Sequence, residues 1–589
     1  MNTLLHKLLP IDDLVKTVKR FPLSVICAFF MFTLSILLVH DFIDEDDDLL
    51  GRVFAVLGCL YFWFGISKLT AENNDWPFIK YFVISSVIGI AIALLLGISD
   101  LWYMHLIFIL PALLLGIMFA PYITSGDDTS FWFFNRTMWF GVVVSYAALI
   151  MFAGGLSLAL LAIHTLFDVD IDEEIYADIW LFAAFILGPI YALSWVPKRF
   201  EYSDTDCQDP TGLRFIANWI SAPMVFVYLL ILYAYFIKIL ISGEVPNGYL
   251  SYMISGFAGA GIVTYLVAWP MRESGAIQLR LFYKIFFPAL IIPVGFHFYA
   301  IWERVSAYGI TEQRYLLMLS ALWFTILALG NIRGKIPIKA IPMTLAILLV
   351  VASFGPWGGV SLSGISQFSR LEKLLEKHNI LQDGKIVKTE EELPFDDRLS
   401  ISSILSYLCR SDRDKMLEPW FGEEGEKVNL SYGHKCYAAK MTESMGFDYV
   451  YYRSSSPDKD RFYINLPRNN FIDISEYDMM LRNVNIYTYS NVKDWENDWP
   501  PYGEHKVKME YGDGELAIYM SIYDTIYIDV NDFASKKVDL KSNSQQIILT
   551  GENNDISYQI DFSSMSGSIK DSKPNVENMG FNFMYRLKN

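Results

Sequence analysis

Four of the eight histidines in this 589-residue chain fall in or beside long apolar segments, at His40, His105, His164 and His297. Ionisable side chains inside a membrane are costly and often functional. A group of imidazoles could bind a metal ion or relay protons. Three of these histidines lie at segment ends, where interfacial water can hydrate them, and only His297 lies well inside. They form either a candidate polar site within the membrane or a set of ordinary interfacial side chains.

Two connections between apolar segments are dense in carboxylates, one near residue 44 and one near residue 171. Carboxylates on neighbouring connections could gather a divalent cation, because oxygen ligands suit hard cations. They could also resemble the acidic first-loop site of polyprenyl-phosphate-dependent glycosyltransferases, which act on lipid-linked substrates. Neither run has the spacing and central glycine of a calcium loop, and acidic residues are also what the outer side of a membrane tolerates. The candidates are Asp44, Glu45, Asp46, Asp170 and Asp172.

The connection 303–315 carries two arginines between two apolar segments. Arg304 and Arg314 flank Tyr308, and acidic residues such as Glu303 lie close by in the sequence. One interpretation is a set of mutual ion pairs that closes the top of the two segments. The other is a site for an anionic headgroup or phosphate, because arginine binds such groups with parallel hydrogen bonds. Both predict that loss of Arg304 would matter.

Prolines interrupt the apolar run 282–302, at Pro288 and Pro293. A proline leaves a backbone carbonyl unpaired, and broken helices of this kind line cavities in many transporters. A cavity beside this run and a simple packing kink are both open.

Two of the five cysteines, Cys409 and Cys436, follow the last apolar run. In an oxidising compartment they could form a disulfide. Two separate buried thiols are the alternative, because sequence separation does not give spatial distance.

Sequence signatures of soluble enzymes are absent, since the chain has no Walker A loop and no HExxH, GxSxG or CxxC motif. Their absence disfavours ATP-driven transport by this chain alone and argues against an enzyme, although enzymatic activity stays open. No cofactor is predicted, apart from the divalent cation that the acidic connections could hold. From residue 361 on, the chain has 27 Lys and Arg against 37 Asp and Glu and shows no basic patch, which argues against nucleic acid as a partner.

These residues are positioned by eleven long apolar runs within the first 357 residues. With 53% hydrophobic and 19% charged residues, the chain is too apolar for a soluble protein of its length. Each run approaches the roughly 20 residues that a helix needs to cross a bilayer. The predicted spans are 22–39, 50–67, 81–98, 102–120, 138–164, 177–196, 215–237, 249–269, 282–302, 315–332 and 340–356.

Lysine and arginine alternate between the connections and so predict the orientation. Of the 20 such residues up to residue 360, 16 fall on one set of connections and four on the other. Cytoplasmic connections carry the excess of positive charge, which places the amphipathic segment 1–21 in the cytoplasm. An odd number of spans in the domain 22–357 then places everything from residue 358 outside the cytoplasm.

The chain after residue 357 changes character twice. Residues 358–446 predict a helical lead-in with helices over 362–381, 397–410 and 434–445. From 447 to 589, short alternating runs separated by turn residues predict an antiparallel β domain. The predicted strands are 447–453, 461–466, 483–489, 505–511, 515–522, 525–530, 544–550, 556–562 and 580–587. The fold class is a membrane all-α bundle of about eleven transmembrane helices with a C-terminal extracytoplasmic α+β domain, mostly antiparallel β.

Three stretches resemble the bacterial multipass membrane family catalogued as domain of unknown function 4153. They are residues 130–136 (SFWFFNR), 303–315 (ERVSAYGITEQRY) and 355–358 (GPWG). The resemblance implies a bacterial cytoplasmic membrane, with the external side periplasmic where an outer membrane is present. It implies no activity and assigns no catalytic residue.

These features favour an envelope protein that binds, senses or assembles through its extracytoplasmic face. Its expected environment is the lipid bilayer, and its expected partners are an envelope protein or a lipid-linked ligand. Two alternatives stay open. One is a secondary transporter with a cavity beside the run 282–302, and the other is a membrane enzyme that uses the acidic outer connections on a lipid-linked substrate.

Overall fold

The computed structural model describes most of the chain, in two compact units that divide at residue 451. The described residues are 11–43, 48–202, 211–243, 249–334, 336–391, 393–421, 431–432, 435–450, 461–465, 474–487, 507–512, 514–520, 523–537, 547–570 and 573–588.

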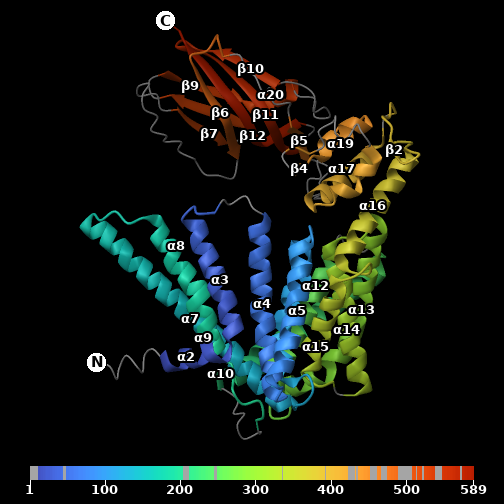
Figure 1. The fold of residues 1–589 in the computed structure, drawn as a ribbon. Coiled ribbons are helices and arrows are strands. Elements are labelled where there is room, and N and C mark those ends of the chain that lie inside the picture. The colour runs from blue at the N-terminus through green and yellow to red at the C-terminus, as the bar shows by residue number, and fades with distance from the viewer. Residues whose placement is uncertain are drawn as a thin grey trace. The chain divides into compact units, whose positions relative to one another are not determined.

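The first unit begins with the short helix α2 (Ile11–Arg20) and continues as a bundle of apolar helices (Figure 1). Within the described residues, ten helical segments are long and apolar enough to cross a membrane, so this is a multispanning membrane protein. They are α3 (Pro22–Val39), α4 (Asp48–Asn73), α5 (Phe78–Ile98), α6 (Trp102–Phe119) with η1 (Ala120–Tyr122), α7 (Asp128–Phe167), α8 (Glu173–Phe182) with η2 (Ala183–Leu187) and α9 (Gly188–Ser194), α10 (Thr211–Ile216) with η3 (Ala217–Ser221) and α11 (Ala222–Ser242), α12 (Leu250–Val267), α13 (Ile277–Tyr308) and α14 (Glu312–Arg333).

The eleventh predicted span, 340–356, is a shorter helix than the sequence pattern indicates. It forms α15 (Ala340–Ser353), whose 14 residues extend only about 21 Å at 1.5 Å per residue. A hydrocarbon core is roughly 30 Å thick. The apolar run is longer than the helix because Phe354 adopts an extended conformation and the backbone turns at Gly355 and Pro356. Its residues Leu349 and Ala352 pack with Phe108 of α6 in a small core of their own.

The prolines of α13 do not break that helix, which is continuous over 32 residues. Pro293 cannot donate to the carbonyl of Ala289, four residues earlier. The hydroxyl of Tyr233, on α11, donates to that carbonyl at 2.9 Å. The unpaired group that the sequence predicts is therefore satisfied by a neighbouring helix.

Aromatic side chains form much of the core of the bundle, and one glycine lets two helices approach closely. A Cβ atom at Gly261 of α12 would lie 2.0 Å from the ring of Phe286 on α13. Phe282, Phe286 and Phe287 are all buried there. Small residues at helix contacts allow this kind of packing.

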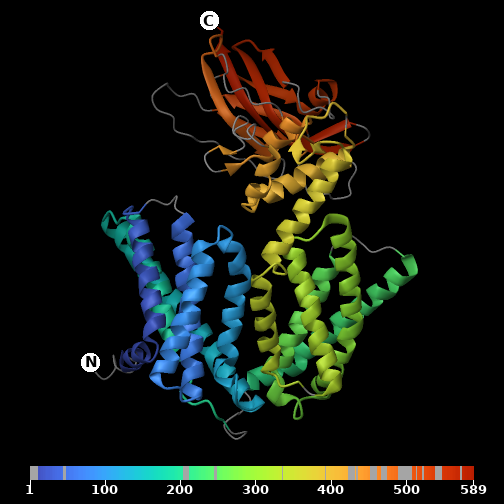
Figure 2. The ribbon, with the colours of Figure 1, turned by 45° about the vertical axis from the view of Figure 1, so that its right-hand side comes forward.

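The helical lead-in belongs to the first unit. Figure 2 shows α16 (Gly359–Lys377) leaving the bundle and carrying α17 (Phe395–Arg410) and α19 (Ala438–Met445) at its far end. Two short hairpins accompany them: β1 (Leu381–Gln382) with β2 (Lys385–Ile386), and β3 (Ser431–Tyr432) with β4 (Lys435–Cys436).

Residues 447–450 are not the start of a strand, and the prediction there was wrong. Phe447 and Tyr449 pack on the apolar core of the lead-in helices instead. Their alternation reflects contact with helices and not with a sheet. Residues 451–453 lie outside the described part of the chain.

The second unit is built from antiparallel strands, as predicted. One sheet has the order β10-β11-β12-β6, with β5 paired to β11, and a three-stranded sheet has the order β7-β8-β9. One continuous core joins both sheets to the helix α20 (Val530–Lys537), which the sequence analysis did not predict. The strands are β5 (Arg461–Asn465), β6 (Met479–Tyr487), β7 (Val507–Gly512), β8 (Glu515–Met520), β9 (Tyr523–Asp529), β10 (Ile547–Glu552), β11 (Ile556–Lys570) and β12 (Lys573–Leu587).

Candidate functional site

His297 lies inside the bundle, on α13, and is completely buried. Its Nε2 lies 3.1 Å from the hydroxyl of Ser320 on α14 and 3.5 Å from that of Ser255 on α12. Three helices thus contribute one polar group each to a small cluster surrounded by apolar side chains.

The other three histidines are held apart from His297 by partners of their own. His105 Nδ1 lies 3.0 Å from the carbonyl oxygen of Ser353, and His164 Nδ1 lies 2.8 Å from that of Val169. His40 lies just past the end of α3, where it contacts carboxylates of α8. The four imidazoles therefore do not form one site.

His40 binds two carboxylates with opposite sides of its ring. Its Nδ1 lies 2.8 Å from Glu174 and its Nε2 lies 3.1 Å from Asp178. The hydrogen bond to Asp178, followed by the charges of both carboxylates, raises the pKa of His40. Because the two ring nitrogens point away from each other, these carboxylates cannot converge with them on one metal ion.

The acidic connections do not assemble a cation site in the part of the chain that the structure describes. Asp44, Glu45 and Asp46 lie outside the described residues. Asp170 and Asp172 precede α8, and the acidic side chains that find a partner nearby are Glu174 and Asp178. Among the described residues, no group of three or more His, Cys, Asp or Glu side chains could hold a metal ion.

The connection 303–315 is much shorter than the sequence predicted. Helix α13 continues through Glu303 and Arg304 to Tyr308, and α14 begins at Glu312. Gly309 ends α13 with a positive φ of +70°, a conformation that favours glycine.

The two arginines of this connection make no ion pair with an acidic residue in the described part of the chain. The Nη1 of Arg314 donates to the carbonyls of Tyr308, at 3.0 Å, and Gly309, at 2.7 Å. The ring of Tyr308 is exposed, and the guanidinium of Arg314 lies 5.6 Å from its centroid. The predicted mutual ion pairs are therefore absent from this connection, and Glu312 has a different partner.

Glu312 and Arg413 form an ion pair that is almost fully buried, with 8% and 4% of their surfaces exposed. The Nη1 of Arg413 lies 2.8 Å from Glu312, and its Nη2 donates to the carbonyl of Val360 at 2.7 Å. The hydroxyl of Tyr407 donates to both carboxylate oxygens, at 2.8 and 2.9 Å. Burial, and then the charge of Glu312, raise the pKa of Tyr407, which keeps it a neutral donor. We call these three residues the buried cluster.

More exposed contacts surround the buried cluster at the same end of the bundle. Tyr103, in the first turn of α6, donates to Asp412 at 3.0 Å, and Lys415 lies 2.7 Å from Asp100. The hydrogen bond from Lys415 holds the pKa of Asp100 below its usual value. The segment after α17 is thus tied to the connection between α5 and α6 as well as to α14.

Cys409 and Cys436 are joined as a disulfide, with their Cα atoms 5.1 Å apart. The bond fastens the last turn of α17 to β4. The buried cluster and the disulfide therefore restrain the same stretch of chain from two sides.

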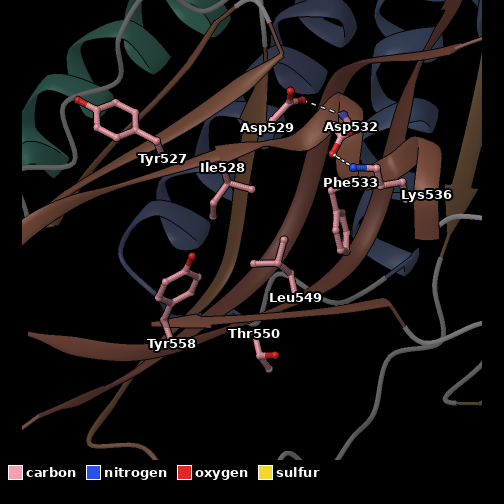
Figure 3. A pocket seen from close by; sticks show the side chains of 9 residues that line it. All are labelled: Tyr527, Ile528, Asp529, Asp532, Phe533, Lys536, Leu549, Thr550 and Tyr558. Atoms are coloured by element: carbon pink, nitrogen blue, oxygen red, sulfur yellow. Dashed lines mark hydrogen bonds and ion pairs between the residues drawn. The ribbon is translucent and has the colours of Figure 1, made fainter. Parts of the chain in front are cut away.

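A hollow of about 360 Å³ lies in the second unit between β9, α20, β10 and β11 (Figure 3). Asp529 accepts a hydrogen bond from the backbone N–H of Asp532 at 2.8 Å, and Asp532 pairs with Lys536 at 2.6 Å. Only Asp532 and Lys536 pair as charges, since the partner of Asp529 is a backbone N–H, while Tyr527 and Tyr558 line the other side of the hollow.

Residues 23–373 match the protein family described as domain of unknown function (DUF4153), which is more than half of the chain. The chain belongs to the DUF4153 family. It is also 26% identical, over 266 residues, to an uncharacterized protein of Pasteurella multocida. That match covers 42% of this chain and 43% of the relative, so the chain spans less than half of the relative's length. No solved structure matches the chain.

Some of the polar residues described above lie inside the DUF4153 segment, and others lie beyond its end. It includes His297, Arg304, Arg314 and Glu312 and ends four residues before the end of α16. Arg413 and the hollow of the second unit lie beyond it. The buried cluster therefore joins the DUF4153 bundle to the part of the chain that follows the family segment.

Proposed function

We propose that this DUF4153 protein is a binding and sensing protein of the bacterial cytoplasmic membrane. In this proposal it binds an envelope protein or a lipid-linked ligand on its extracytoplasmic face, and binding is transmitted to the helical bundle. The buried cluster carries the proposal, because it joins the lead-in to the first turn of α14.

The orientation is supported by where the lead-in makes its contacts. It touches the connection 99–101 through Lys415 and the connection 309–311 through Gln367, whose side-chain amide donates to the carbonyl of Ile310 at 2.9 Å. The positive-inside rule assigns both connections to the outer side. Both connections precede α15, so their assignment is the same whether or not α15 crosses the membrane.

The free-energy cost of separating the buried ion pair makes the buried cluster suitable for transmitting a shift of the lead-in to α14. Removing one partner of a buried ion pair leaves an uncompensated charge, which is strongly unfavourable. The pair therefore fixes the position of the segment after α17 relative to α14. A ligand that shifts the lead-in must either move α14 as well or separate the two charges. Two discrete arrangements of this kind are what population shift requires.

The test reconstitutes the purified full chain in liposomes and adds lipid and soluble fractions of a bacterial envelope. We expect ligand binding to slow hydrogen exchange in both the lead-in and the first turn of α14. In Arg413→Ala the change should stop at the lead-in. Arg410→Gln is the matched control, because Arg410 is exposed at the end of α17, and it should behave like the native chain.

Sidedness is tested separately with reporters fused after residue 357. A periplasmic reporter should be active at that position, and a cytoplasmic reporter should be silent. The opposite result would exclude an extracytoplasmic lead-in.

A secondary transporter is the second candidate, supported by the cluster of His297, Ser255 and Ser320 on three helices. Intramembrane ionisable groups often mark transport pathways. Ion-driven solute flux into liposomes that is lost in His297→Ala, without any envelope ligand bound, would favour this candidate over the sensing role. No observation in the described residues favours the lipid-linked enzyme.

A further inference from the structure

Three arginines from three helices lie near one another at the outer end of the bundle, and two of them lie over the ring of Tyr308. Arg304 lies in the last turns of α13, Arg314 in the first turn of α14 and Arg370 on α16. The guanidinium carbons of Arg314 and Arg370 lie 5.6 and 5.9 Å from the centroid of the Tyr308 ring. Arg304 and Arg370 are both near enough to act electrostatically on Arg314. We call these three residues the arginine patch.

The arginine patch lacks compensating negative charge in the part of the chain that the structure describes. None of its three members makes an ion pair with an acidic residue there. Glu312 is only two residues from Arg314, but its carboxylate is bound by Arg413 at 2.8 Å. Glu303 points to solvent from its position beside Arg304.

Holding the three guanidinium groups together is unfavourable without an anion. All three side chains are half-buried, so solvent screens their mutual repulsion incompletely. Arg314 uses Nη1 for two backbone carbonyls, and a guanidinium has five N–H donors in all. Donors thus remain for a ligand, and their planar geometry matches the oxygens of a phosphate.

Aromatic side chains place the arginine patch at the height of lipid headgroups. Tyr252 of α12 and Tyr299 and Trp302 of α13 are 51%, 51% and 72% exposed at this end of the bundle. Exposed tyrosine and tryptophan at helix ends are typical of the membrane interface. A phosphate on an outer-leaflet lipid would therefore arrive at the level of the arginines.

We propose that Arg304, Arg314 and Arg370 form a binding site for a phosphate group carried by a lipid headgroup, with the Tyr308 ring positioning two of the guanidinium groups. This inference rests on the proposed function, which places the arginine patch on the extracytoplasmic side. It adds that one ligand of that side carries a phosphate group.

The experiment measures binding of short-chain phosphatidylglycerol to the purified full chain in a neutral detergent, with short-chain phosphatidylcholine for comparison. We expect the anionic lipid to bind at least about tenfold more tightly than the zwitterionic one, as charge-assisted hydrogen bonds imply. Arg314→Gln and Arg370→Gln should each weaken binding by about tenfold or more. Arg314→Lys should retain part of the affinity, because lysine keeps the positive charge but lacks the planar set of donors that binds a phosphate with two parallel hydrogen bonds.

Lys373→Gln is the matched control, since Lys373 is exposed on the same helix, three residues after Arg370. It removes the same charge and should leave the affinity unchanged. Arg370 donates no hydrogen bond to another described residue, so Arg370→Gln should keep the native thermal midpoint and separate lost binding from lost folding.

Inorganic phosphate added as a competitor distinguishes the sources of the phosphate group. If millimolar phosphate displaces the lipid as effectively as free headgroup does, the arginine patch binds phosphate itself; if it does not, the lipid is required. Equal affinity for both lipids, or native affinity in Arg314→Gln and Arg370→Gln, would overturn the proposal. Neither result would alter the exchange of α14, so failure here is distinct from failure of the sensing role.

Discussion

The buried cluster and the arginine patch lie at the same end of the first unit, and they treat positive charge in opposite ways. In the buried cluster, Arg413 is matched by Glu312 and by the hydroxyl of Tyr407. In the arginine patch, the guanidinium groups of Arg314 and Arg370 lie over one aromatic ring, and Arg314 alone donates to two backbone carbonyls. The first arrangement is complete within the chain, whereas the second presents donors to a ligand. The difference indicates that the buried cluster stabilises the fold, whereas the arginine patch is suited to binding an anionic ligand.

The largest expected effect comes from breaking the buried cluster. Arg413→Met leaves Glu312 buried without its charge partner, and we expect about 3–5 kcal/mol of lost stability. Denaturant unfolding of the full chain in detergent measures it. The double variant Glu312→Leu with Arg413→Met should recover much of the loss, because it removes both charges. Equal effects of the single and double variants would show that the charge itself is unimportant.

Removal of the disulfide tests whether the ion pair of Glu312 and Arg413 is enough by itself to keep the lead-in helices folded. Replacing Cys409 and Cys436 by serine opens a loop with a separation of 27 residues, and we expect a loss of about 3 kcal/mol. Hydrogen exchange in α17 and α19 measures it. A reducing agent should produce the same change in the native chain and none in the double variant.

A smaller effect is expected at the boundary of the arginine patch. Gly309→Ala places a side chain at a φ of +70°, where its Cβ would lie 2.8 Å from the side-chain nitrogen of Gln367. We expect about 1–3 kcal/mol of destabilisation, together with weaker binding of phosphatidylglycerol because Arg314 donates to the Gly309 carbonyl. Gly334→Ala is the control, since nothing lies within 4 Å of a Cβ there. Equal stability of the two variants would argue against strain at Gly309.

The smallest effect concerns His40, which like Arg413 is paired with carboxylates of the chain. Its pKa is raised in the folded chain, so its contribution to stability is complete below the unfolded value, near 6.5. That contribution is lost as the pH rises through the higher folded pKa. Stability profiles of the native chain and His40→Gln should converge at alkaline pH and separate toward pH 5.5. Parallel profiles would contradict the assignment of the pKa shift to Asp178 and Glu174.

The positions of the long apolar helices could be predicted from the sequence, whereas the residues at which the helices end could not be predicted as well. Ten of the predicted spans correspond to long apolar helices, because roughly 20 apolar residues leave a chain few alternatives. The extension of α13 was missed, since Glu303 and Arg304 have the polarity of a connection. Helical geometry continues there until Gly309, whose backbone conformation ends it.

Alternation located the strands of the second unit but not their full lengths. Strands β11 and β12 each extend for 15 residues, far beyond the predicted 556–562 and 580–587. A serine-rich stretch in β11 hides the alternation of apolar residues there. Helix α20 was missed because eight residues following a strand give too little helical periodicity.

The sequence placed both arginines of the 303–315 connection in the candidate site but could not find their surroundings. Arg370 and Arg413 come from segments far along the chain, and only the fold brings them to α14. The sequence pattern predicted ion pairs between these arginines and nearby acidic residues, of which Glu312 lies only two positions from Arg314. In the structure its carboxylate is bound by Arg413, which removes the negative charge from the arginine patch.

The length of α7 has a consequence for the surrounding lipid. Its 40 residues extend about 60 Å, twice the thickness of a typical hydrocarbon core. Figure 1 shows it running obliquely to α4, and its last residues, Leu166 and Phe167, are exposed. A helix longer than the hydrocarbon core is accommodated by tilting, by kinking or by a locally thicker bilayer, so α7 favours a tilted orientation or thicker lipid surroundings.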